Sequence, residues 1–119
     1  MNSYRIKIDF RKKCYLIETP KEALMTTFFL FGRYTQDAMK KISSDRTRKA
    51  INEVQKLGGR VKSVYALLGD NDLVFIVSLP GPAQATLVSI ALSKLTGIVF
   101  KTATAIPVDE FDQLINKYK

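Results

Sequence analysis

A chain of 119 residues with 46% hydrophobic and 25% charged residues suits one small folded domain, and excludes both a disordered chain and two independent cores. Histidine is absent and there is one cysteine, which excludes Ser-His-Asp and Cys-His catalysis, an internal disulfide and a zinc site of the usual ligands. No phosphate-binding glycine motif occurs, and no apolar run approaches the ~20 residues of a membrane span. We therefore expect a cytoplasmic protein without a cofactor or a metal.

The formal net charge of +8 is concentrated in two segments. Residues 1–24 carry six bases and three acids (+6 − 3 = +3), and residues 37–62 carry eight bases and three acids (+8 − 3 = +5). Such segments can attract nucleic acid or acidic partners. The simpler interpretation is a solvated basic helix face, and we prefer it because no nucleic-acid recognition motif accompanies the charge.

Residues 1–24 admit two interpretations. Apolar side chains alternate with charged ones over residues 4–10, as in an amphipathic strand that adds to a sheet edge or is exchanged between subunits. In the other interpretation Met25 is the true initiator, because Lys21-Glu22-Ala23 can be encoded by a purine-rich ribosome-binding stretch. The intact mass of the protein from its native cells distinguishes the two. We expect the folded domain to comprise residues 25–119.

From residue 25 onward the elements alternate clearly. Turn and cap residues separate them: Ser43 and Pro82 are typical of helix starts, and Gly58 and Gly97 of helix ends. The pattern predicts a strand over 26–31 bounded by Gly32, a helical turn within 36–42, a helix from 43 to 57, a strand over 60–68, a turn at 69–72, a strand over 73–79, a helix from 82 to 96, a strand over 98–104 and a final helix after Pro107.

This order, β-α-β-β-α-β plus a C-terminal helix, predicts an α+β protein with a ferredoxin-like split β-α-β fold. Both main helices should cover one face of a four-stranded antiparallel sheet. Residues 28–31 and 73–79 are nevertheless apolar on both faces, so the helix-free face needs a cover as well. A second copy of the chain is the simplest cover, which predicts a homodimer or a higher homo-oligomer; the alternative is the C-terminal helix of the same subunit.

Four segments of the chain resemble the GYD domain family of bacterial and archaeal proteins. They are Met25-Thr26-Thr27-Phe28, the run from Gly58 to Tyr65 (GGRVKSVY), the run from Leu68 to Val74 (LGDNDLV) and the run from Thr104 to Glu110 (TAIPVDE). The resemblance implies a ferredoxin-like fold related to dimeric α+β barrels, and it implies no activity. One position departs from the family pattern, because Asn71 stands where the family's Gly-x-Tyr-Asp has tyrosine. Asn71 keeps the turn chemistry but lacks the hydroxyl.

The predicted topology brings five residues to one end of the sheet. They are Arg33, Tyr34, Tyr65, Asp72 and Lys101. Arginine, tyrosine, aspartate and lysine side chains at one end of an apolar sheet face suit a small anionic ligand. The alternative is a surface ion pair between Arg33 and Asp72 that contributes little.

The sequence favours a self-assembling domain that binds a small, anionic ligand at a sheet end or at a subunit interface. It contains no identified catalytic residue. A cofactor-independent enzyme of the dimeric α+β barrel type is an alternative by fold analogy alone. Weak nucleic-acid binding through the basic first helix is a further alternative, which predicts affinity that falls steeply with salt.

Overall fold

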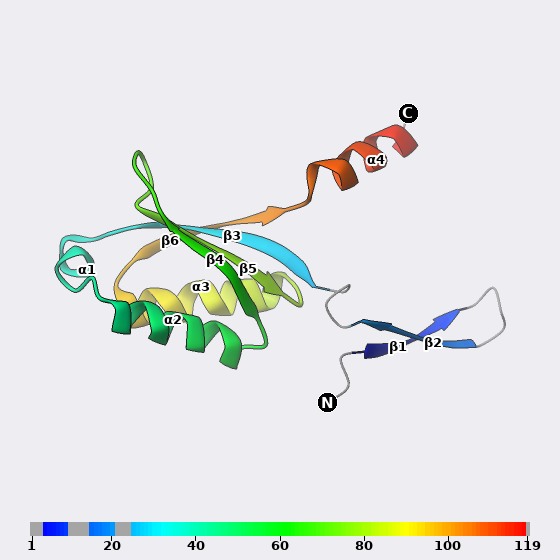
Figure 1. Ribbon diagram of the computed structural model, residues 1–119, viewed down its shortest axis with the longest axis horizontal. Coiled ribbons are helices and arrows are strands. Elements are labelled where there is room, and N and C mark those ends of the chain that lie inside the picture. The colour runs from blue at the N-terminus through cyan, green and yellow to red at the C-terminus, as the bar shows by residue number, and fades with distance from the viewer. Residues whose placement is uncertain (1–3, 10–14, 21–24, 119) are drawn as a thin grey trace.

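The computed structural model describes residues 4–9, 15–20 and 25–118 (Figure 1). The strands are β1 (Tyr4–Asp9), β2 (Tyr15–Pro20), β3 (Thr26–Arg33), β4 (Arg60–Ala66), β5 (Leu73–Leu79) and β6 (Val99–Ala105). The helices are α1 (Gln36–Lys40), α2 (Ser44–Lys56), α3 (Pro82–Thr96) and α4 (Val108–Tyr118). β1 and β2 pair with each other in a separate two-stranded antiparallel sheet, so a strand is present where the alternation over residues 4–10 predicts one. The tenth residue lies outside the described ranges.

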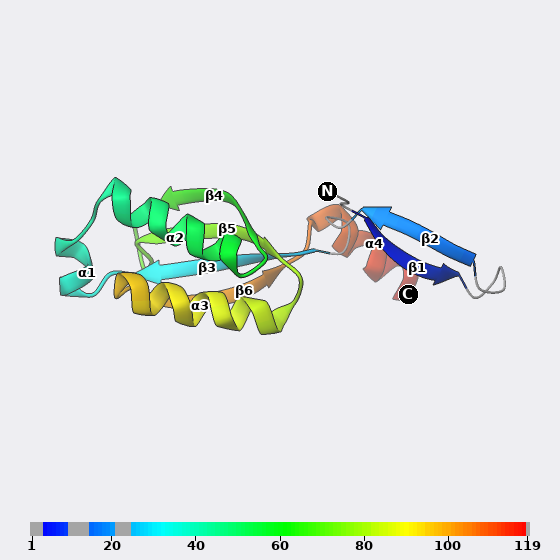
Figure 2. The same cartoon turned by 90° about the horizontal axis from the view of Figure 1, so that it is seen from below.

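β3 to β6 form a four-stranded sheet in the order β4-β5-β3-β6, with every neighbouring pair antiparallel. This is the strand order of the split β-α-β fold, and the ferredoxin-like prediction is confirmed. Helices α2 and α3 lie side by side across one face of the sheet, as Figure 2 shows from below. The added C-terminal helix is also present, as α4.

Local side-chain chemistry sets the helix boundaries where the sequence predicted them. The Ser43 hydroxyl accepts a hydrogen bond from the backbone N–H of Arg46 at 3.0 Å, which caps the start of α2. Gly58 follows the end of α2 at φ +88°, and Gly97 caps α3 in the left-handed conformation at φ +74°. Residues other than glycine rarely adopt a positive φ angle, so a glycine at each of these positions favours the end of the helix.

β3 does not end before Gly32, and this boundary of the prediction is wrong. Gly32 pairs with Leu73 on β5 and with Phe100 on β6, and the strand continues to Arg33. A Cβ atom at Gly32 would lie 2.5 Å from Leu73 Cδ2 and 2.9 Å from Ile98 Cγ2. The glycine therefore permits close packing in the middle of the sheet rather than a turn. Two other strand ends also shift: β4 ends at Ala66, and β6 runs one residue later than predicted.

The core lies between the sheet and helices α2 and α3. Its largest fully buried side chains come from two strands and both helices: Leu30, Val54, Val77, Leu79, Val88 and Leu92. Residues opposite one another in antiparallel strands share a face, so the buried Phe28 and Leu30 place Val77 and Phe75 on the helix side. The strand residues between them point to the other side.

We call that other side the open face. Its strand positions are Thr27, Phe29, Phe31, Arg33, Arg60, Ser63, Tyr65, Val74, Ile76, Ser78, Val99, Lys101, Ala103 and Ala105. Phe29, Phe31 and Ile76 remain partly exposed there. The alternative that the C-terminal helix covers this face within one subunit is not what the structure shows, because α4 contains no buried residue and stands beyond the end of the sheet (Figure 1).

We predict that Gly32→Ala lowers the free energy of unfolding by about 1–3 kcal/mol, because the added methyl group overlaps Leu73 and Ile98. Urea denaturation measures the change. Gly81→Ser is the control: a Cβ atom there lies 3.6 Å from its nearest neighbour, the Oε1 atom of Gln84, and the stability should not fall. Equal losses for both variants would contradict close packing at Gly32.

Candidate functional site

Three of the five residues that the sequence predicted as a site lie on the open face at one end of the sheet. Lys101 is opposite Phe31 on β3, and Phe31 is opposite Val74 on β5. Val74 is in turn opposite Tyr65 on β4, so these four residues form one row across the sheet. Arg33 lies two residues beyond Phe31 on the same face.

The other two predicted residues support the fold. The Asp72 Oδ2 atom accepts a hydrogen bond from the backbone N–H of Tyr34 at 2.7 Å. The backbone N–H of Asp72 donates to the Gly32 carbonyl, and the Asp72 carbonyl accepts from the Leu67 N–H, both at 2.8 Å. Asp72 thus joins the end of β3 to the turn before β5. The Tyr34 ring packs against the core, with the Arg46 guanidinium 5.6 Å from its centroid.

The basic side chains at this end have no ion-pair partner among the described residues. The two ion pairs found among the described residues both involve Asp45, which lies on α2 and not at this end of the open face. Arg33 is opposite Val99, so Arg33 and Lys101 are diagonal neighbours on one face, and residues so related are typically ~7–8 Å apart. Two long cationic side chains at this spacing repel each other, and an anion held between them relieves the repulsion.

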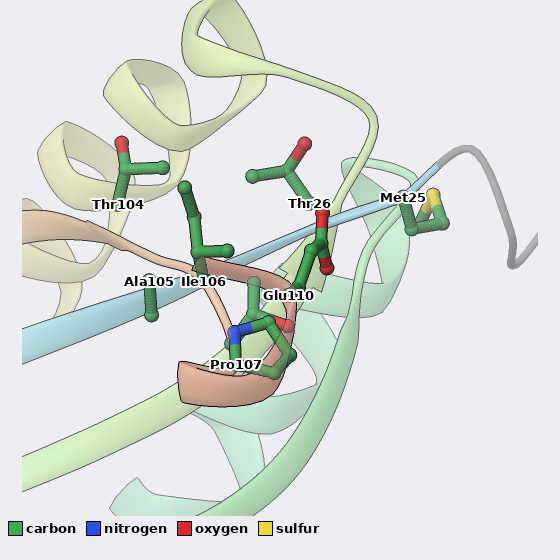
Figure 3. Close-up of a pocket in the computed structure, with 8 residues that line it drawn as sticks. Met25, Thr26, Thr104, Ala105, Ile106, Pro107 and Glu110 are labelled. Atoms are coloured by element: carbon green, nitrogen blue, oxygen red, sulfur yellow. The ribbon is translucent and has the colours of Figure 1, made fainter. Parts of the chain in front are cut away.

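Two connected pockets lie at the opposite end of the sheet, where the sequence predicted no site. The larger, of about 370 Å³, is lined by Met25, Thr26, Thr27, Thr104, Ala105, Ile106, Pro107 and Glu110. Figure 3 shows the Glu110 side chain projecting from the start of α4 toward Thr26. The second, of about 250 Å³, shares four of these residues and adds Phe29 and Lys62. The Lys62 ammonium donates to the Thr27 hydroxyl at 3.0 Å.

Lys62 reaches the open face because of an irregularity in β4. The register between β4 and β5 shifts between Val61 and Ser63, which places the extra residue beside Thr27. Nothing in the run of residues 60–66 announces this β-bulge, so sequence reasoning could not place Lys62 at the site. The alignment of Thr27 with Ala105 was accessible in principle, because it follows from the strand register.

A third pocket, of about 320 Å³, lies between α3 and the sheet and is lined by residues that include Phe28, Ser89 and Thr102. The Thr102 hydroxyl donates to the Ser89 hydroxyl at 3.3 Å. No group of three or more metal-binding side chains occurs in the part of the chain that the structure describes. The described helices also include none long and apolar enough to cross a membrane.

Several cations of the basic helix are already engaged within the subunit. Arg48 and Lys49 both pair with Asp45, with Lys49 Nζ 3.3 Å from the Oδ2 atom. The hydrogen bond and charge of Lys49, with a smaller contribution from Arg48, lower the pKa of Asp45 from its ordinary value. Arg46 donates to the Ala38 carbonyl at 2.5 Å. These contacts favour the interpretation of α2 as a solvated helix face.

Comparison with known proteins identifies both a family and a fold. The GYD domain matches the chain over residues 28–115. No curated protein matches it. Among solved structures, the chain is similar to an AsnC family transcriptional regulator from Agrobacterium tumefaciens, with 19% identity and a TM-score of 0.51 over 82% of this chain and 60% of that one. It is also similar to the leucine response regulatory protein of Mycobacterium tuberculosis, with 12% identity and a TM-score of 0.49 over 83% of this chain and 65% of that one.

The chain therefore spans less than two thirds of the length of either regulator. At 19% identity the likeness to the Agrobacterium tumefaciens protein shows a shared fold alone. The regulators' role in transcription belongs to those proteins and is not transferred by the match.

We predict that Asp72→Ala lowers the free energy of unfolding by about 1–2 kcal/mol, because the backbone N–H of Tyr34 loses its acceptor. Asp72→Asn keeps an acceptor oxygen and should lose less. Asp70→Ala, in the same exposed turn, is the matched control and should change the stability by under about 0.5 kcal/mol. Urea denaturation compares the three, and an Asp72→Ala variant as stable as the wild type would contradict the structural role.

We predict that Asp45→Asn lowers stability at pH 7 and that the loss disappears in acid. The native pKa of Asp45 lies below the ordinary value of 3.8, so its charge stabilises the fold above that pH. The contribution is lost as the pH falls through the native pKa. Urea denaturation of both proteins at pH 7 and pH 2.5 tests the sign. If the variant lost the same free energy of unfolding at both pH values, the charge of Asp45 would not be the cause of the loss.

Proposed function

This chain belongs to the GYD domain family, and from that premise we propose that it is a self-assembling domain that binds a small anion at the open face of its sheet. The single observation that carries the proposal is the composition of that face, which is apolar at its centre and cationic at its ends. α4 does not cover the open face within its own subunit, because none of its residues is buried.

Self-assembly is supported by the apolar centre of the open face. Phe29 and Phe31 contact each other there with ring centroids 6.0 Å apart, and Ile76 lies opposite Phe29. Antiparallel sheets that expose one face to water usually alternate apolar with polar residues, whereas β3 and β5 are apolar on both faces. Burial of such a face against a second copy removes its apolar surface from water.

Anion binding is supported by the charges around that centre. Arg33 and Lys101 occupy one end of the face, and the Tyr65 hydroxyl belongs to the same row as Lys101. No carboxylate occupies a described strand position of the open face, and the nearest in register, Asp72, accepts from the Tyr34 N–H. A carboxylate or phosphate between the guanidinium and the ammonium gains charge-assisted hydrogen bonds, and burial by a second copy strengthens them.

The alternatives have less support. A cofactor-independent enzyme of the dimeric α+β barrel type rests on fold analogy, and Asp72, the carboxylate nearest the predicted site, is engaged by the backbone. Nucleic-acid binding through the basic helix would use Arg48 and Lys49, which pair with Asp45 within the subunit. Anion binding at the open face uses Arg33 and Lys101, which have no ion-pair partner among the described residues.

We predict a homodimer or higher homo-oligomer at micromolar concentration, measured by light scattering coupled to gel filtration. Ile76→Asp should dissociate it, because burial of an unpaired carboxylate in the interface is costly. Asn52→Asp adds a carboxylate at an exposed position of α2, and as the control it should leave the assembly intact. A wild-type protein that stays monomeric throughout the micromolar range would refute self-assembly.

We predict that inorganic phosphate and succinate bind to the assembled protein and that Arg33→Ala or Lys101→Ala weakens binding about tenfold or more. The affinity should also fall as salt is added. Lys94→Ala, an exposed cation at the end of α3, is the control. Isothermal titration calorimetry measures all four proteins. Affinities that are the same in the wild type and the Arg33 and Lys101 variants, or no binding of either probe, would contradict the proposed site.

A further inference from the structure

α4 is an amphipathic helix in which the structure shows no buried residue. Its apolar side chains follow helical spacing on one side: Phe111, Leu114, Ile115 and Tyr118. Phe111 is 51% exposed and Leu114 is 50% exposed. A helix of 11 residues is marginal in water unless its apolar side packs against something. The apolar side of α4 therefore needs another surface to pack against, and the described residues of this subunit do not provide one.

The charges of α4 and of the open face are opposite in sign. The described part of α4 carries Asp109, Glu110 and Asp112 against one base, Lys117, which gives −3 + 1 = −2. The open face carries Arg33 and Lys101 at one end and receives Lys62 at the other, with no strand carboxylate among the described residues. Each surface combines an apolar centre with flanking charge, so the two are complementary.

The position and length of α4 also match this surface. Two residues, Ile106 and Pro107, join β6 to α4. The helix stands beyond the end of the sheet, on the side opposite α2 and α3, which is the side of the open face (Figure 1). At ~1.5 Å per residue, α4 is about 16 Å long. The four strands span about 14 Å at ~4.8 Å per neighbouring pair. One such helix can therefore extend across the full width of the sheet.

We infer that α4 is an exchanged arm: in the homodimer, α4 of each copy packs its apolar side on the open face of the other copy. The occupant is a second copy because every chain carries both complementary surfaces, and a two-fold axis satisfies both at once. This inference rests on the proposed self-assembly and adds the element that covers the face.

Cross-linking between two different variants tests the contact. One protein carries Ile76→Cys and the other Leu114→Cys, both in a Cys14→Ser background of the full chain. The two are mixed, allowed to exchange subunits and oxidised. We expect a disulfide-linked heterodimer in the mixture, identified by mass spectrometry, at several times the yield of a mixture in which Gln113→Cys, on the polar side of α4, replaces Leu114→Cys. No excess over this control would overturn the inference.

A substitution in α4 measures the contribution of the arm to assembly. Phe111→Asp should raise the dimer dissociation constant on the order of a hundredfold, because it places a carboxylate against the apolar centre of the partner's face. Gln113→Asp adds the same charge on the polar side and should leave the constant nearly unchanged. Circular dichroism checks that both variants keep the fold, which we expect because α4 is exposed within its own subunit.

The outcomes separate this inference from the proposed function. A wild-type chain that is monomeric at all concentrations refutes self-assembly and the arm together. A stable dimer that withstands Phe111→Asp and gives no heterodimer cross-link refutes the arm alone. A monomer in which the double variant Ile76→Cys/Leu114→Cys forms an internal disulfide shows that α4 folds back on its own sheet, which also overturns the exchange.

Discussion

The organisation of this molecule depends on one constraint, that the two central strands are apolar on both faces. β3 and β5 direct Phe28, Leu30 and their neighbours into the core, but they also place Phe29 and Ile76 on the opposite side. Helices α2 and α3 cover only one of these faces (Figure 2). Removal of the second apolar face from water lowers the free energy of the protein. The charged and polar side chains at the margins of this face then determine which partner can bind there.

The element order was accessible from sequence because local signals and global topology agree. Ser43, Gly58 and Gly97 define helix ends through hydrogen bonding and backbone angle alone. Gly32 gave a misleading signal: a glycine next to an apolar run is typical of a turn, whereas here it makes room for Leu73 and Ile98. That reason exists only once three distant segments have packed together, and no local pattern records it.

The candidate site was predictable only in part, for a similar reason. Strand register places Tyr65 and Lys101 in one row, and this follows from counting residues along a correct topology. Side-chain engagement does not follow from counting. An aspartate such as Asp72 is suited to an ion pair, yet its carboxylate accepts a hydrogen bond from the backbone N–H of Tyr34 instead. Tyr34 follows Arg33 directly, and strand alternation sends its ring to the core side instead.

The bulge in β4 has a consequence for how copies of this chain can associate. β4 and β6 are the outer strands of the sheet, and a regular outer strand is a template on which further chains can pair without limit. The register shift between Val61 and Ser63 interrupts the hydrogen-bonding ladder of β4 and increases its local twist. Growth into fibres by edge-to-edge pairing along β4 is thereby disfavoured, whereas association through the face of the sheet does not use this edge.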